Sequence, residues 1–89
     1  MKFEWDARKA ASNARKHRVT FDEAMTVFAD WESITVPDPD HSEGEERCMI
    51  LGMSALNRVL VVFHADRGEN VRIISARRAD LRERKKYGK

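Results

Sequence analysis

Three apolar segments of strand length follow one another in the second half of the sequence, at residues 47–53 (RCMILGM), 58–64 (RVLVVFH) and 71–76 (VRIISA). They are rich in Val and Ile, which favour strands, and only the loops S-A-L-N and A-D-R-G-E-N separate them. Connections this short join antiparallel neighbours, because a parallel pair needs a much longer crossover. The second segment is apolar throughout from Val59 to Phe63, which is typical of a strand covered on both faces. The sequence therefore predicts an antiparallel meander with residues 58–64 near its centre.

The residues before this meander predict one short strand and two helices. The opening K-F-E-W alternates polar and apolar side chains, as a strand does. Residues 7–17 contain no Gly or Pro and are rich in Ala, Arg and Lys, which predicts a helix with Asp6 as its N-cap. Thr20 and Glu23 form the capping-box pattern T-x-x-E of a second helix, which we expect to end near Asp30.

The remaining segments complete an α+β pattern. S-I-T-V at residues 33–36 predicts another strand, followed by a turn at residues 37–39 and a polar segment that reaches Glu46. Residues 79–88 predict a final basic helix. The expected fold is an antiparallel sheet of four to five strands with two N-terminal helices and a C-terminal helix. Because 89 residues suit one small core, we expect residues 1–89 to form a single domain.

Charge is segregated along the chain. Residues 1–18 carry six basic and two acidic groups, residues 30–46 seven acidic and no basic groups, and residues 71–89 eight basic and two acidic groups. The basic ends suggest a polyanionic partner such as a nucleic acid. The acidic middle suggests either a basic partner or a solvated loop.

Several classes of protein are disfavoured by what the sequence lacks. Cys48 is the only cysteine, so an intramolecular disulfide framework is excluded, and we expect an inert core thiol. No apolar run approaches the length of a membrane span, and the charged opening M-K-F-E-W-D does not resemble a signal peptide. We therefore expect a cytoplasmic location with no membrane partner.

Metals and nucleotide cofactors are also not expected. The three histidines, at positions 17, 41 and 64, lie far apart and match no zinc spacing. Asp38, Asp40 and Ser42 resemble the start of a calcium loop, but Met49 stands where the bidentate glutamate is required. The glycines match no phosphate-binding loop.

Five arginines lie on or beside the predicted strands, where packing usually excludes this residue. They can form a fixed phosphate clamp, because a guanidinium presents paired planar donors to phosphate oxygens. Alternatively, they cap the strands and pair with the acidic middle segment, and the sequence leaves both interpretations open. The five are Arg47, Arg67, Arg72, Arg77 and Arg78.

Other residues allow a functional or a structural interpretation. His64 ends the apolar strand, where an imidazole can transfer a proton at neutral pH or simply pack. Arg82 and Lys85 belong to the basic final helix, which can contact a nucleic-acid backbone or form a solvated surface. Tyr87 can stack on a base or pack on its own domain.

An RNA ligand needs no metal or cofactor for cleavage, since its 2′-hydroxyl can attack the adjacent phosphate. The protein then orients that hydroxyl, stabilises the developing charge and moves protons. The residues equally allow a noncatalytic module that binds nucleic acid or a protein partner.

The ordered motifs F-E-W-D-x-x-K-A-x-x-N-x-x-K-H, V-T-F-D-E-A, S-E-G-E-E-R and R-I-I-S-A-R-R-A, with Tyr87 after them, resemble the BrnT family over nearly the whole chain. The resemblance implies a type II toxin, an endoribonuclease of RelE-like fold that cleaves RNA and so inhibits translation and growth. It also implies an antitoxin whose DNA-binding domain is ribbon-helix-helix. Toxin and antitoxin would form a two-plus-two complex, which reaches operator DNA only through the antitoxin.

The resemblance also implies roles for particular residues. Arg72 and Arg77 would bind the phosphate and transition-state charge, Arg47 and Arg67 would position the RNA, and His64 would transfer a proton. Lys16 would contact RNA. From their own placement in the sequence, we also expect RNA contacts at Arg78, Arg82, Lys85 and Tyr87. The chain departs from the family at Arg18, where glycine is usual after K-H, and at Ala65, where threonine is frequent.

Overall fold

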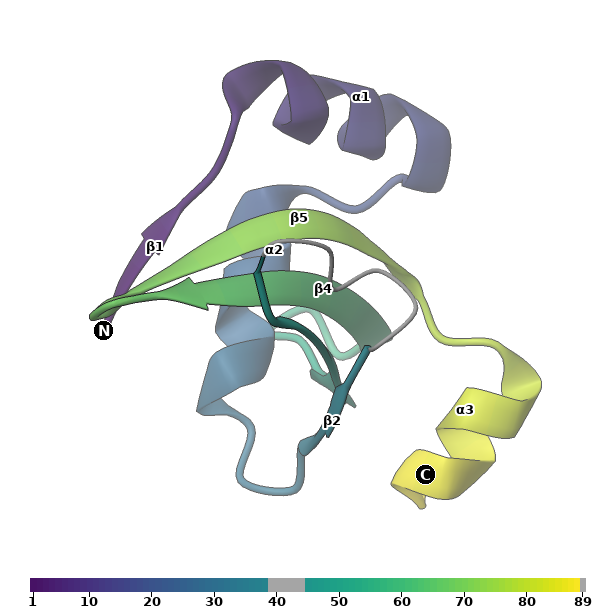
Figure 1. Ribbon diagram of the computed structural model, residues 1–89. Helices are drawn as coiled ribbons and strands as arrows, with labels where there is room; N and C mark the ends of the chain where they lie inside the picture. Colours follow the sequence, from purple (N-terminus) through teal and green to yellow (C-terminus); the bar gives the residue numbers. More distant parts are fainter. Residues whose placement is uncertain (39–44, 89) are drawn as a thin grey trace.

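The computed structural model of the chain describes residues 1–38 and 45–88. Within them the chain forms three α-helices, one 3-10 helix and five strands (Figure 1), which confirms the predicted α+β class. The elements in chain order are β1 (Lys2–Glu4), α1 (Ala7–His17), α2 (Phe21–Thr26), η1 (Val27–Ala29), β2 (Ile34–Pro37), β3 (Arg47–Met53), β4 (Val59–Arg67), β5 (Asn70–Arg78) and α3 (Leu81–Tyr87).

The five strands form one sheet in the order β1-β5-β4-β3-β2. Strands β2 to β5 pair as an antiparallel meander with β4 in the middle, so both of these predictions are confirmed. The expectation of a wholly antiparallel sheet is wrong at one place, because β1 pairs parallel with β5. No hairpin joins these two strands, and their relative direction is therefore not fixed by a short loop.

The β4–β5 hairpin is longer than predicted. Strand pairing continues through Asp66 opposite Val71 and Arg67 opposite Asn70. The true turn is consequently only two residues long, with Gly68 at φ 63°.

At the other end of the meander, Pro37 lies within β2 instead of in a turn. The last residue of the predicted turn, at position 39, and most of the calcium-like pattern lie outside the described residues.

Capping explains where the helices begin. The Asp6 carboxylate accepts hydrogen bonds from the backbone N–H groups of Arg8 (2.8 Å) and Lys9 (3.1 Å), which confirms it as the N-cap of α1. Thr20 accepts from the N–H of Glu23 (3.0 Å), but the glutamate side chain does not complete the predicted capping box. A complete box occurs instead at the start of α3, between Asp80 and Glu83.

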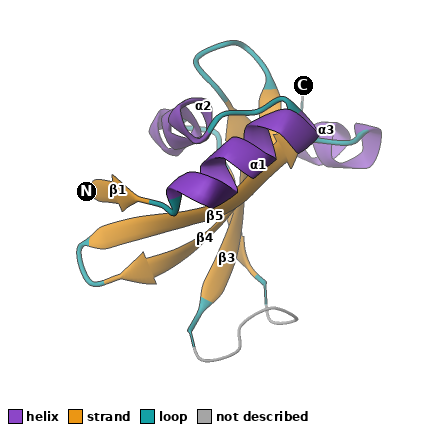
Figure 2. Ribbon diagram, turned by 90° about the horizontal axis from the view of Figure 1, so that it is seen from above, coloured by secondary structure: helices purple, strands orange, loops and turns teal. Residues whose placement is uncertain are grey.

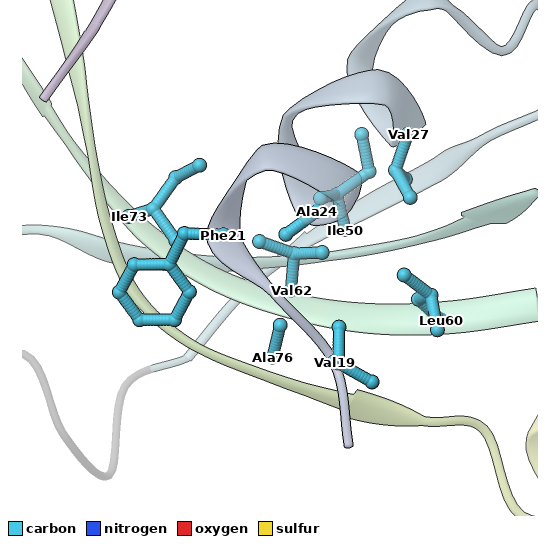
Figure 3. Packing of buried hydrophobic residues seen from close by; sticks show 9 residues of the cluster. All are labelled: Val19, Phe21, Ala24, Val27, Ile50, Leu60, Val62, Ile73 and Ala76. Atoms are coloured by element: carbon cyan, nitrogen blue, oxygen red, sulfur yellow. The ribbon is translucent and has the colours of Figure 1, made fainter. Parts of the chain in front are cut away.

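Helices α1 and α2 cover one face of the sheet, and Figure 2 shows α1 lying over β5. Figure 3 shows α2 and its flanking turns packed on the strands. This core consists of Val19, Phe21, Ala24, Val27, Ile50, Leu60, Val62, Ile73 and Ala76. Helix α3 contacts the sheet at β3, where Tyr87 packs in a second cluster with Leu51 and Val61. We call this second side of the sheet the arginine face, after Arg47, Arg72 and Arg77.

Asn13, from the N-terminal motif, supplies hydrogen bonds to the edge of β5 that β1 leaves uncovered. Strand β1 covers β5 only at residues 70–72, so Ala76 lies beyond its reach. The buried Asn13 amide donates to the Ala76 carbonyl (2.8 Å) and the Val19 carbonyl (2.9 Å), and its oxygen accepts from the Ala76 N–H (3.1 Å). Asn13 therefore replaces a neighbouring strand and ties α1 to the sheet.

Arg18 holds a backbone conformation that favours glycine, with φ 59° and ψ 32° at the end of α1. Left-handed backbone costs a residue with a β-carbon about 1–2 kcal/mol, and glycine avoids this cost at some expense in chain entropy. We expect Arg18→Gly to raise the free energy of unfolding by about 1 kcal/mol in urea titrations. Arg18→Ala is the control, because it removes the side chain and keeps the strain. Equal stability of the two variants would contradict the argument.

Candidate functional site

Two arginines are brought together by the strand register. Arg47 on β3 and Arg72 on β5 both lie opposite Ala65 of β4. Residues directly opposite one another share a face of the sheet, so the two guanidinium groups flank the short, fully buried side chain of Ala65. Ala65, one of the two positions at which the chain departs from the family it resembles, thus lies between the two arginines.

Arg77 lies on the same face, further along β5 and opposite Val61. Its two terminal nitrogens donate to the two oxygens of Glu83, at 2.7 and 2.9 Å. These hydrogen bonds raise the pKa of Arg77 and lower the pKa of Glu83. The Asp80 N–H also donates to Glu83 (2.9 Å), so the start of α3 holds Arg77 in a fixed direction. The guanidinium lies over the Phe63 ring, 5.8 Å from its centroid.

One N–H donor of Arg72 has no acceptor among the described residues. Its Nη2 pairs with the Glu45 carboxylate, whereas its Nε is buried and finds no acceptor among the described residues. A buried N–H without an acceptor costs about 1–3 kcal/mol, so such groups usually serve a ligand or an ordered water. This nitrogen is the clearest sign of a ligand on the arginine face.

Arg67 lies at the margin of the arginine face, near the β4–β5 turn. Its side chain is 55% exposed, and Nη1 is 3.8 Å from Glu4 Oε2. Asn70, opposite Arg67 in the register, donates to the same carboxylate (2.8 Å). Glu4 therefore anchors this margin to β1.

His64 lies on the opposite, helix-covered face. Its side chain is 5% exposed and packs against the Phe28 ring, with 4.9 Å between centroids. Neither ring nitrogen has a hydrogen-bond partner in the described part of the chain, and Nδ1 is 3.9 Å from Asp66 Oδ1. Burial lowers the pKa of His64 and favours the neutral ring. The structure thus separates this histidine from the arginines with which the sequence analysis grouped it.

Tyr87 is also separated from the arginine pair. It is buried beneath α3, and its hydroxyl donates to the Asp30 carboxylate. Burial, together with this hydrogen bond, raises the pKa of Tyr87 to about 12. The ring therefore packs within the domain and does not offer a surface to a base.

The remaining predicted RNA contacts lie at three different places. Arg78 is opposite Leu60, on the helix-covered side, where its charge helps to lower the pKa of Glu23. Arg82 and Lys85 are exposed on α3. Lys16 is exposed on α1, where it lines a shallow pocket with residues of α1 and with β5.

Sequence reasoning missed a pocket on the arginine face. Asp38, Arg47, Phe63, Ile74 and Ser75 line it, and its volume is about 180 Å³. The register shifts between Phe63, opposite Ser75, and His64, opposite Ile73, so Ile74 is the extra residue of a bulge. Ile74 and Ser75 also line the pocket that contains Lys16. The bulge therefore connects the arginine face with α1.

Among residues 1–38 and 45–88, no group of three or more His, Cys, Asp or Glu side chains is placed to hold a metal ion. In the same part of the chain, no helix has both the length and the apolar character needed to cross a bilayer.

Comparison with known proteins identifies the family. The family model described as "Ribonuclease toxin, BrnT, of type II toxin-antitoxin system" matches residues 5–83. The chain belongs to the BrnT family. It is therefore a ribonuclease toxin with a cognate antitoxin, and the alternative of a noncatalytic module is set aside.

A solved structure agrees with this fold. The chain is similar to the ribonuclease toxin BrnT of Brucella abortus, known from a crystal structure at 1.1 Å, with a TM-score of 0.71 and 24% sequence identity. The match covers 91% of this chain and 99% of the other. At this identity the likeness concerns the fold. No curated protein sequence matches the chain.

Proposed function

We propose that this BrnT toxin, as one domain of residues 1–89, binds and cleaves RNA on its arginine face. The buried Nε of Arg72, which finds no acceptor among the described residues, carries the proposal, because it offers a donor where a phosphate oxygen can lie. Arg72 and Arg77 contact the scissile phosphate and its developing charge, and Arg47 and Arg67 position the strand. The glutamates that pair with Arg72, Arg77 and Arg67 hold these side chains in place before RNA binds.

The proposed reaction uses the RNA's own nucleophile. The 2′-oxygen forms a bond to phosphorus, the bond to the 5′-oxygen breaks, and the proton lost by the 2′-hydroxyl is balanced by protonation of the leaving oxygen. The products are a 2′,3′-cyclic phosphate and a 5′-hydroxyl. Fixed guanidinium donors stabilise the charge that gathers on the phosphorane oxygens. His64 lies on the other face, so we assign it a packing role instead of proton transfer to RNA.

Flanking nucleotides follow the basic surface of the toxin. Lys16 lies across the β5 bulge from the arginine face, in a pocket that also contains Lys9 and His17. Helix α1 contains no acidic residue, which favours contact with a phosphate backbone. Arg82 and Lys85, exposed on α3, provide further backbone contacts, and Tyr87 provides none because it is buried.

Analysis of product ends tests this mechanism. Purified toxin in EDTA should cleave RNA and leave 2′,3′-cyclic phosphate ends. A strand with deoxyribose at the cleavage position should remain intact, because it lacks the attacking hydroxyl. Dependence on added magnesium, or equal cutting of the deoxy-substituted strand, would show that the proposed reaction is wrong.

We further propose that the antitoxin has a ribbon-helix-helix DNA-binding domain and forms a two-plus-two complex with the toxin. These two details come from the family resemblance. Two features of the chain support a covering partner. The arginines of the arginine face already pair with carboxylates, so an acidic segment can occupy them. The side chains of Trp31 (99% exposed) and Leu56 (66% exposed) leave apolar surface in water.

Co-purification of the toxin with the protein encoded beside it should give a complex that melts at a higher temperature than free toxin, because the partner binds the folded state. The same complex should not cleave RNA if the partner covers the arginine face. Its mass in solution reports the stoichiometry. A partner that bound without suppressing cleavage would contradict occlusion of this face.

A further inference from the structure

We propose that the pocket beside Arg47 holds a single unstacked nucleobase and prefers guanine. The inference rests on the proposed cleavage of RNA at the arginine face. The pocket volume of about 180 Å³ is below the roughly 300–1,000 Å³ of pockets that take drug-sized ligands. This size suits one flat ring system.

The location places such a base next to the reacting phosphate. In the register, Phe63 and Ser75 form the row between the Arg47–Arg72 row and the row that contains Arg77. These are the arginines that we propose to contact the scissile phosphate and position the strand. A nucleotide whose phosphate lies among them would carry its base to the intervening row.

Phe63 provides the stacking surface. Its ring is half-buried and lines the pocket, and Arg77 lies over it without lining the pocket. The Phe63 side chain therefore contributes an aromatic surface to the pocket. Single-stranded RNA is commonly recognised by bases stacked on aromatic side chains. The apolar side chain of Ile74, displaced by the bulge, adds a second wall.

The polar part of the lining favours a base edge over a phosphate. The Asp38 carboxylate only accepts hydrogen bonds and repels phosphate, whereas the Ser75 hydroxyl can donate or accept. Asp38 is held at the pocket because its N–H donates to the Arg47 carbonyl (2.9 Å), which extends the β2–β3 pairing. Guanine presents an imino and an amino donor side by side and so matches a carboxylate. Uracil presents one imino donor.

Oligouridine RNAs in which one position is replaced by guanosine or inosine test the preference. Each RNA is cleaved by wild-type toxin, and the position of the cut is mapped. We expect cleavage beside guanosine, and about tenfold slower cleavage beside inosine, which lacks the amino donor. Asp38→Asn should remove the difference between guanosine and inosine, because its amide group also presents N–H donors. Phe63→Leu should slow cleavage, and Phe63→Tyr should retain it. Met53→Leu, on the same face outside the pocket, is the control for general repacking.

The outcomes separate the pocket from the reaction. Equal cleavage beside guanosine, inosine and uridine by wild-type toxin, or an unchanged preference in Asp38→Asn, would overturn the pocket inference and leave the cleavage proposal intact. Retention of full cleavage without Arg72 would overturn the proposed reaction site itself. If Phe63→Leu does not fold, the Asp38→Asn and inosine results decide the question without it.

Discussion

Arg72→Ala should slow RNA cleavage about 10²–10³-fold, because it removes a fixed donor to the developing phosphorane charge. The effect should appear in the rate of the bound complex more than in RNA affinity, since we propose that several other cations contact the RNA backbone. Arg72 is on the surface of the sheet and pairs only with Glu45 among the described residues, so the fold should persist. Single-turnover cleavage of a defined RNA measures the rate, and circular dichroism shows whether the variant is folded.

Three further variants make this result specific. Arg82→Ala removes an exposed arginine from α3 and should change cleavage by less than about threefold, as expected for one surface phosphate contact. Arg72→Lys keeps the charge but loses the paired donors, so it should recover only part of the rate. His64→Gln should retain most of the cleavage. A loss in His64→Gln as large as that in Arg72→Ala would place the histidine in the reaction and contradict the separation of the two faces.

Local patterns were sufficient to predict most elements of this fold. The bounds of residues 7–17 and 47–53 agree with α1 and β3, because capping residues and strand-length apolar runs mark them. The direction of β1 was not predictable in this way. It depends on which edge of the sheet the first strand joins, and no short loop encodes that choice.

The site was harder to predict than the fold. Alternation puts Leu60, Val62 and His64 on one face of β4 and Val61 and Phe63 on the other. Both faces are apolar, so alternation does not show which of them the helices cover. The placement of Arg47 and Arg72 on either side of Ala65 depends in turn on the two-residue turn at Gly68, for which the sequence predicted a six-residue loop.

Contacts between distant segments explain the remaining differences. Tyr87 bonds to Asp30, which is 57 positions away in the sequence. Glu23, predicted to cap its own helix, instead bonds to Ser54 and Arg58 of the β3–β4 loop. Propensity and spacing describe near neighbours, so they contain no information on these partners.

The Glu23 contacts form a buried ionic network that ties α2 to the β3–β4 hairpin. The Glu23 side chain is 4% exposed. It accepts hydrogen bonds from Ser54 Oγ (2.7 Å) and from Arg58 Nε (2.9 Å), and Arg58 Nη2 pairs with its second oxygen. The bond to Arg58 lowers the pKa of Glu23 more than burial raises it. The carboxylate therefore remains charged inside the protein, with the hydrogen bond from Arg58 as the largest cause and Ser54 and Arg78 as smaller ones.

Arg58→Met should lower the free energy of unfolding at neutral pH by about 3 kcal/mol, because it leaves a buried carboxylate without its cation. In the wild type, Glu23 stabilises the fold above its ordinary pKa of 4.5, and this contribution is lost as the pH falls through the lower folded-state value. In the variant, burial without the arginine should raise the folded-state pKa above 4.5, so acidification should relieve the destabilisation. Urea unfolding from neutral pH down to about pH 5 should therefore show the two proteins converging. The double variant with Glu23→Gln removes the stranded charge and should recover part of the loss. A stability difference that stayed constant with pH would mean that Arg58 acts through packing alone.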